Sequence, residues 1–238
     1  MQRTTWVRVE AGTEAQPMLV RWSTFLPPSP DGIGGAVYLA FALATPEGPV
    51  LVDPVWPATD SAERLQDLVR RMGGRPTASL LTNEMHERDA YAARDRWNIP
   101  VWAPAAGAGE YEGRPDYTYR EGDPLPGGVR AISIEGPFPG DTCLHWRAAD
   151  GTGILFTGDA VLGYRDEQDP RPFTGGAEPG LFLHGVGAHP RGVQDVGRFT
   201  ASLRRLLDLE FDVVCAAHGR PYVGGAKAAL ARLLDAPR

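Results

Sequence analysis

Four segments of the sequence share one pattern, an apolar run that ends directly in a carboxylate or an imidazole. They are "VLVDP" with Asp53, "SLLTNEMHERDA" with His86, "LFTGDA" with Asp159 and "VVCAAHG" with His218. In layered α/β proteins chemistry gathers at such strand ends, because the sheet fixes the positions and the loops supply access. Four such endings in one chain therefore indicate a functional site built from the ends of strands.

The order of the predicted elements indicates how these strands are arranged. Apolar and alternating runs predict a group of strands, a mixed β/α segment, a second group of strands and a second mixed segment. Helices are expected over 60–72, Glu87–Trp97 and 193–209, and a last short helix carries Leu230, Leu233 and Leu234. Two similar halves predict two sheets packed together with helices outside. No repeat or linker divides the chain, so a single domain over 1–238 is expected.

The composition excludes some classes of partner. Asp and Glu number 30 against 24 Lys and Arg, the net charge is −6, and the basic residues form no run. This argues against nucleic acid or an anionic membrane and favours a small-molecule substrate or ligand. The most apolar run, "GGAVYLAFALA", is about half as long as the ~20 residues of a membrane span, and no signal peptide is recognised. We therefore expect a cytoplasmic protein with Cys143 and Cys215 reduced and packed, and leave a homo-oligomer open.

At the four strand endings the sequence resembles the metallo-β-lactamase fold superfamily. "GPVLVDP" resembles the strand that carries the family's structural Asp, and "LLTNEMHERDA" occupies the place of its THxHxDH motif. "AISIEGPFPGDT" resembles the GHTPG turn, "ILFTGDA" the strand with the metal-bridging Asp, and "VVCAAHGRP" the strand with the final His. The resemblance extends from about Val37 to Tyr222 and implies a four-layered αβ/βα sandwich. It also implies one or two metal ions, usually zinc, and hydrolysis of lactams, thioesters, esters or phosphoesters.

Transferred residue by residue, the family's ligand set is only partly present. Asp159 and His218 match outright, and Glu87 stands at the Asp position of the first motif. The remaining His positions of the family fall on Asn83, Met85, Arg88 and Pro137. If the loop is one residue longer than in the family, His86 replaces a lost ligand and Asp89 offers another carboxylate.

The first functional hypothesis is a hydrolase with one metal ion. His86, Asp159 and His218 supply two imidazoles and a carboxylate, which suits Zn²⁺, Fe²⁺ or Mn²⁺. Glu87 or Asp89 would assist as a further carboxylate and would favour Mn²⁺ or Mg²⁺. Asp159 and His86 are the expected catalytic residues, with Asp159 binding the ion and orienting its water. The expected substrate is a small ester-, thioester- or phosphoester-type molecule.

The second hypothesis is a metal-free binding or regulatory protein with the same fold. Here the Arg88 guanidinium enters the space of the second metal ion and pairs with Asp159 or Glu87, since two facing buried carboxylates require a cation. Arginine keeps its proton and generates no hydroxide, so the fold would remain without hydrolysis. Two simpler alternatives also stand, namely an exposed His86 beside a helix start and Arg88 on a helix surface.

The remaining candidates are expected to have lesser roles. Asp53 is expected to hold the neighbouring loop by hydrogen bonds, and Asn83 to line the pocket. His184 and His189 lie in a Gly/Pro-rich segment, Gly163–Gly192, which could cover the site as a lid. The simplest interpretation of both histidines is that they are loop residues, while a lid would allow either of them to reach the site.

Overall fold

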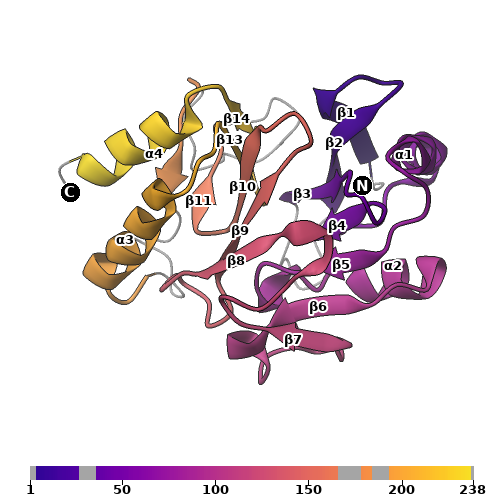
Figure 1. Cartoon of the computed structure of the whole chain (residues 1–238). Helices are drawn as coiled ribbons and strands as arrows, with labels where there is room; N and C mark the ends of the chain where they lie inside the picture. The colour runs from indigo at the N-terminus through magenta and orange to yellow at the C-terminus, as the bar shows by residue number, and fades with distance from the viewer. Residues whose placement is uncertain (1–3, 27–35, 166–177, 184–192, 237–238) are drawn as a thin grey trace.

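The computed structural model describes residues 4–26, 36–165, 178–183 and 193–236 (Figure 1). His184 and His189 lie outside these ranges, as does most of the Gly163–Gly192 segment, for which a lid was left open. In the described part of the chain, no helix is long and apolar enough to cross a membrane.

The first sheet contains strands that follow one another across the sheet in chain order. Its first half is antiparallel, and from the fourth strand onward the pairing is parallel. In the second strand Leu19 and Phe25 face the other sheet, while Val20 and Trp22 pack with the helices, as strand alternation requires. The strands are β1 (Thr4–Gly12), β2 (Pro17–Leu26), β3 (Ala36–Leu43), β4 (Val50–Val52), β5 (Ala78–Leu80), β6 (Val101–Pro104) and β7 (Tyr117–Tyr119), and the helices α1 (Thr59–Arg71) and α2 (Ala90–Trp97) cover the outer face.

The second sheet has the order β14-β13-β10-β9-β8. Only β10 and β13 pair parallel, and the other neighbours are antiparallel. The helices α3 (Val196–Arg204) and α4 (Ala226–Asp235) cover its outer face, and β11 (Val161–Leu162) and β12 (Phe182–Leu183) form a separate small pair. The strands of the sheet are β8 (Arg130–Ser133), β9 (Thr142–Arg147), β10 (Gly153–Gly158), β13 (Val213–Ala216) and β14 (Tyr222–Val223).

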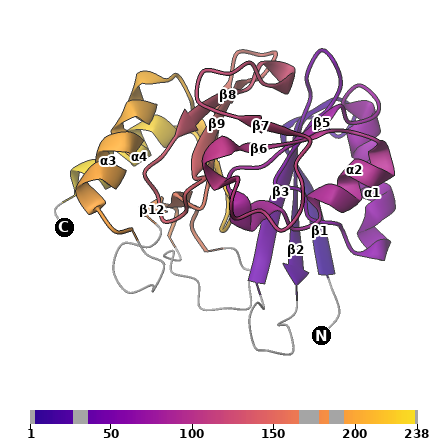
Figure 2. The same cartoon turned by 90° about the horizontal axis from the view of Figure 1, so that it is seen from below.

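The two sheets pack face to face, with one pair of helices outside each of them (Figures 1 and 2). Between the sheets the rings of Phe41 and Phe156 meet edge to face, with their centroids 5.2 Å apart. Cys143 and Cys215 are free and buried, as expected of packing residues. The predicted four-layered αβ/βα sandwich is confirmed.

Two predicted helices differ from those observed. The helix expected over Glu87–Trp97 begins only at Ala90, because Glu84–His86 forms a 3₁₀ turn and Arg88 has a φ of 35°. The helix expected over 193–209 begins at Val196, where the side chain of Asp195 accepts a hydrogen bond from the Arg198 N–H. The first difference matters for function, because it determines where the side chains after β5 point.

Trp22 provides a test of how β2 is fixed to the loop after β4. Its indole Nε1 donates to the Val55 carbonyl at 2.6 Å, in a fully buried setting. We expect Trp22→Phe to lower the free energy of unfolding by about 1–2 kcal/mol, because the Val55 carbonyl loses its donor. Trp102→Phe is the matched control, since the buried Nε1 of Trp102 has no hydrogen-bond partner among the described residues. Urea unfolding measures both variants, and equal losses would contradict this account.

Candidate functional site

The ends of β4, β5, β10 and β13 bring four side chains of the predicted site together. The imidazole Nε2 of His86 lies 3.1 Å from Asp159 Oδ2, and Nε2 of His218 lies 3.5 Å from Asp159 Oδ1. On its other side, His86 Nδ1 lies 2.9 Å from Asp53 Oδ2. Asp53, His86 and Asp159 are almost completely buried. The structure therefore places His86 in the site, in contrast to the exposed position that was the simpler alternative.

Asp53 organises the loop that follows β5. Its Oδ1 accepts a hydrogen bond from the Thr82 N–H at 2.8 Å, and its Oδ2 accepts from Thr82 Oγ1 at 2.6 Å and faces His86 Nδ1. Asp53 itself has a φ of 47°, a left-handed conformation that Asp and Asn tolerate better than other side chains do. The carboxylate thus fixes both the start of the loop and the orientation of the His86 ring.

The hydrogen bonds at Nδ1 determine what each imidazole presents to Asp159. His218 Nδ1 lies 2.9 Å from the Val37 carbonyl oxygen, which can only accept, so Nδ1 carries a hydrogen. His86 Nδ1 faces the Asp53 carboxylate and donates to it for the same reason. A neutral imidazole has one N–H, so a neutral ring at either position presents the lone pair of Nε2 to Asp159.

The charges of the site favour an ionised Asp159 and a protonated His86. Burial and the Arg88 charge lower the pKa of His86, but Asp53 and Asp159 raise it by more, so it rises to about 9. Burial raises the pKa of Asp159, but His86, His218 and Arg88 hold it well below its usual range. A protonated His86 therefore donates from both ring nitrogens, to Asp53 and to Asp159.

His218 behaves differently, because it has one carboxylate neighbour instead of two. Burial lowers its pKa to about 4, Asp159 opposes this shift, and Arg88 adds to it. The ring is neutral at physiological pH, and its acceptor Nε2 faces Asp159 Oδ1, a buried oxygen that has no hydrogen-bond partner among the described residues. His218 Nε2 and Asp159 Oδ1 are both acceptors and lie 3.5 Å apart, so a cation or a donor that contacts both atoms would stabilise this arrangement.

A single divalent metal ion fits this donor set. Two imidazoles with Nδ1 engaged by an acceptor, and with Nε2 turned toward one carboxylate, match the way histidine ligands are held in metal sites. No group of three or more His, Cys, Asp or Glu side chains within the described ranges is already arranged around a metal position. In the metal-free protein, His86 Nε2 and Asp159 Oδ2 are in direct contact at 3.1 Å. Both imidazoles converge on the same carboxylate, which is the donor chemistry that a divalent ion requires.

Arg88 is half-buried near the site, but among the described residues it does not form the expected pairs with Asp159 or Glu87. Its Nη1 donates to the Leu39 carbonyl at 3.3 Å, and its guanidinium lies 4.4 Å from the centre of the Tyr38 ring. Burial lowers its pKa, while the charges of Asp53 and Asp159 raise it. The guanidinium contributes positive charge to the site without direct contact. The predicted pairing of Arg88 with Asp159 or Glu87 was therefore wrong.

Glu87 and Asp89 were predicted as possible metal ligands, but their carboxylates are bound to other partners. The Glu87 carboxylate turns to the loop after β6, where it accepts from Tyr91 Oη at 2.5 Å and from the N–H groups of Glu112 at 2.7 Å and Gly113 at 2.9 Å. Asp89 Oδ2 accepts from the Trp56 N–H at 2.6 Å, which joins the start of α2 to the loop after β4. Among the contacts of the described residues, neither carboxylate meets Asp159.

Asn83 and Asp141 form a second polar contact beside the site. Asn83 is fully buried, and its Nδ2 donates to Asp141 Oδ1 at 3.0 Å. Burial and the negative charge of Asp159 raise the pKa of Asp141 to about 7, although hydrogen bonds from Phe138 and Asn83 oppose the shift. Sequence reasoning missed Asp141, and the available signal was a carboxylate at the end of the "GPFPGD" turn, directly before β9.

Comparison with solved structures identifies the fold. A metallo-β-lactamase from Pontibacter korlensis matches with a TM-score of 0.62 and 17% identity over 98% of this chain and 100% of its own. One from Hirschia baltica matches with a TM-score of 0.63 and 12% identity over 99% and 100%. A B3 metallo-β-lactamase described as having an active-site glutamic acid matches with a TM-score of 0.54 and 21% identity over 90% and 85%. The fold expected from the resemblance is confirmed. No protein-family model and no curated protein matches the sequence.

Proposed function

We propose that this chain, which has the metallo-β-lactamase fold, is a hydrolase that binds one divalent metal ion through His86, Asp159 and His218. The observation that carries the proposal is the convergence of two imidazole Nε2 atoms on one carboxylate, at 3.1 and 3.5 Å. Zn²⁺, Fe²⁺ and Mn²⁺ all suit two nitrogens and a carboxylate. The proposed substrate is a small ester, thioester or phosphoester.

Each residue of the proposed site has a distinct role. Asp53 and the Val37 carbonyl hold the two imidazoles through Nδ1 and leave Nε2 for the ion. Asp159 offers two oxygens, of which Oδ1 has no hydrogen-bond partner in the described part of the structure and is available to orient a water molecule. When bound, the ion would supply a water of lowered pKa as the nucleophile. Arg88 adds a fixed positive charge that favours the ionised form of Asp159.

Metal content measured by elemental analysis, with hydrolysis as a second readout, tests the proposal. We expect about one equivalent of metal in protein purified without chelator and supplied with Zn²⁺, Mn²⁺ or Fe²⁺. His218→Ala should lose the ion and slow hydrolysis of p-nitrophenyl acetate, acetylthiocholine or bis-p-nitrophenyl phosphate by about 100-fold or more. His145→Gln is the matched control, because His145 Nε2 lies 2.9 Å from the Glu210 carbonyl and outside this cluster. Less than about a tenth of an equivalent in the wild type would contradict the proposal.

One observation favours a second candidate, a metal-free binding protein. A protonated His86 between Asp53 and Asp159, together with the buried Arg88 guanidinium, balances the two carboxylates without an ion. In this case a chelator leaves the melting temperature unchanged, whereas a metal hydrolase loses stability when its ion is removed. Melting with and without EDTA therefore separates the two candidates.

A further inference from the structure

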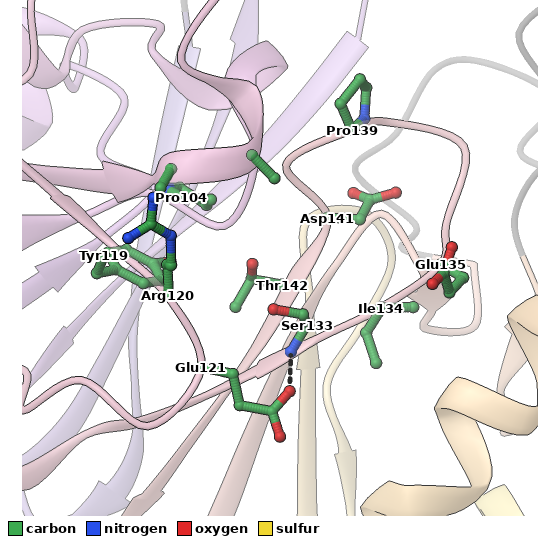
Figure 3. Close-up of a pocket in the computed structure, with 12 residues that line it drawn as sticks. Pro104, Tyr119, Arg120, Glu121, Ser133, Ile134, Glu135, Pro139, Asp141 and Thr142 are labelled. Atoms are coloured by element: carbon green, nitrogen blue, oxygen red, sulfur yellow. Dashed lines mark hydrogen bonds between the residues drawn. The ribbon is translucent and has the colours of Figure 1, made fainter.

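A pocket lies between the two sheets, and Asp141 is one of the residues that line it (Figure 3). Its volume is about 520 Å³, within the range of about 300–1,000 Å³ that is usual for small-molecule sites. The segments after β6 and β7 form one wall, and the end of β8 and the start of β9 form the other. Its lining includes Pro104, Tyr119, Arg120, Ile134 and Asp141.

Asp141 is a buried carboxyl group without a basic partner in this pocket. Its Oδ1 accepts from Asn83 Nδ2 at 3.0 Å, and its Oδ2 accepts from the Phe138 N–H at 3.0 Å. Both donors are neutral, and Asp141 forms no ion pair among the described residues. Each carboxylate oxygen can accept a second hydrogen bond, so the group has capacity for an ammonium donor. A ligand cation would supply the positive charge that the protein does not place there.

Arg120 presents the opposite charge on the other wall. Its neighbours Glu121 and Glu135 are already engaged, the first with Arg205 and the second with Arg198. Within the part of the chain that the structure describes, the Arg120 guanidinium forms no hydrogen bond or ion pair. Figure 3 shows Arg120 beside Pro104 and Tyr119, across the pocket from Asp141. A guanidinium is suited to two parallel hydrogen bonds with a carboxylate.

The surface between these two charges is mixed, with the apolar side chains of Pro104 and Ile134 beside the hydroxyl groups of Ser133 and Thr142. Pro104 and Ile134 are buried. The ring of Tyr119 is fixed by a hydrogen bond of 2.5 Å from its Oη to the Leu81 carbonyl. A ligand that fits this arrangement carries an ammonium at one end, a carboxylate at the other and an apolar body between them. We propose that this pocket binds a small zwitterion of the amino acid or short peptide class, with its ammonium at Asp141 and its carboxylate at Arg120.

The proposal does not depend on the metal hydrolase. Arg120 and Asp141 are not ligands of the proposed ion, and the hydrogen-bond partners of the Asp141 carboxylate are Asn83 and the Phe138 N–H. Binding to the pocket is therefore expected in chelator-treated protein as well as in metal-loaded protein. This makes the failure of one proposal distinguishable from the failure of the other.

Calorimetric titration with L-leucyl-L-leucine and L-leucyl-L-leucyl-L-leucine tests the assignment, because both carry their ammonium and carboxylate at opposite ends. We expect at least one of them to bind, and N-acetyl-L-leucyl-L-leucine and L-leucyl-L-leucinamide, which each lack one charge, to bind about tenfold more weakly or worse. Arg120→Gln should weaken binding of the zwitterion by a similar factor without affecting binding of L-leucyl-L-leucinamide, because that ligand has no carboxylate. Arg114→Gln, at an exposed position outside the pocket, is the control.

Asp141→Asn is the second test variant, for which we expect loss of binding of the zwitterions but not of N-acetyl-L-leucyl-L-leucine. Since Asp141 is buried and this variant can fail to fold, the exposed Arg120 keeps the test decisive on its own. Absence of binding of both zwitterions up to about 10 mM would overturn the proposal. Binding that is unchanged by Arg120→Gln, or equal for charged and uncharged ligand ends, would overturn it too.

Discussion

The Asp53→Ala variant is expected to lose about 3–5 kcal/mol of unfolding free energy, the largest effect of any substitution considered for this protein. The carboxylate accepts hydrogen bonds from Thr82 N and Thr82 Oγ1 and faces His86 Nδ1, and all three groups are buried. Removing it leaves the two Thr82 donors without their acceptor and leaves the charged His86 ring with one carboxylate in place of two. Alanine is also disfavoured at the φ of 47° found at this position.

Asp53→Asn separates the effect of losing the carboxylate charge from the effect of placing alanine in a left-handed backbone conformation. Asparagine tolerates the left-handed conformation and keeps an acceptor for the Thr82 N–H, so it should lose about half as much free energy as alanine. Urea unfolding measures both variants, with Asp95→Ala as a surface control whose side chain is 73% exposed. A loss below about 1 kcal/mol for Asp53→Ala would show that the loop after β5 is held by other contacts.

The positions of the strand ends could be predicted from sequence because the signals are local. Apolar runs place Asp53, Asp159 and His218 at the ends of β4, β10 and β13, and a sheet fixes where those ends meet. The pairing of two sheets between two helical layers follows from the repeated order of strands and helices. The family motifs strengthened that expectation, and the observed fold agrees with it.

The loop after β5 could not be predicted from sequence, because its conformation depends on contacts with distant segments. Arg88 adopts a positive φ and Glu84–His86 forms a 3₁₀ turn, so side-chain directions no longer follow helical spacing. Glu87 turns toward the N–H groups of Glu112 and Gly113, which are 25 and 26 residues away in the chain. Asp141 escaped notice for the same reason, since its partner Asn83 is 58 residues distant.

The metal-free protein should lose on the order of 3 kcal/mol of unfolding free energy as the pH rises from 6.5 to 9, and His86 is the cause. The folded protein holds the His86 proton with a pKa of about 9, above the ordinary value of 6.5. A raised pKa contributes stability that is complete below 6.5 and is lost as the pH passes through 9. Asp159 and His218 titrate at lower pH, because both of their pKa values are depressed, and do not contribute in this range.

Urea unfolding of EDTA-treated protein at a series of pH values tests this, with His86→Gln as the comparison. The difference between the wild type and His86→Gln reports the His86 contribution together with its effect on the pKa of the neighbouring Asp141. The unfolding free energy of the wild type should fall toward that of His86→Gln as the pH rises. Parallel dependence on pH in the two proteins would contradict a charged His86. The ring nitrogen that faces Asp159 is also the one proposed to bind the metal ion. A saturating metal ion should therefore remove most of the slope in the wild type, and it should have no such effect in His86→Gln.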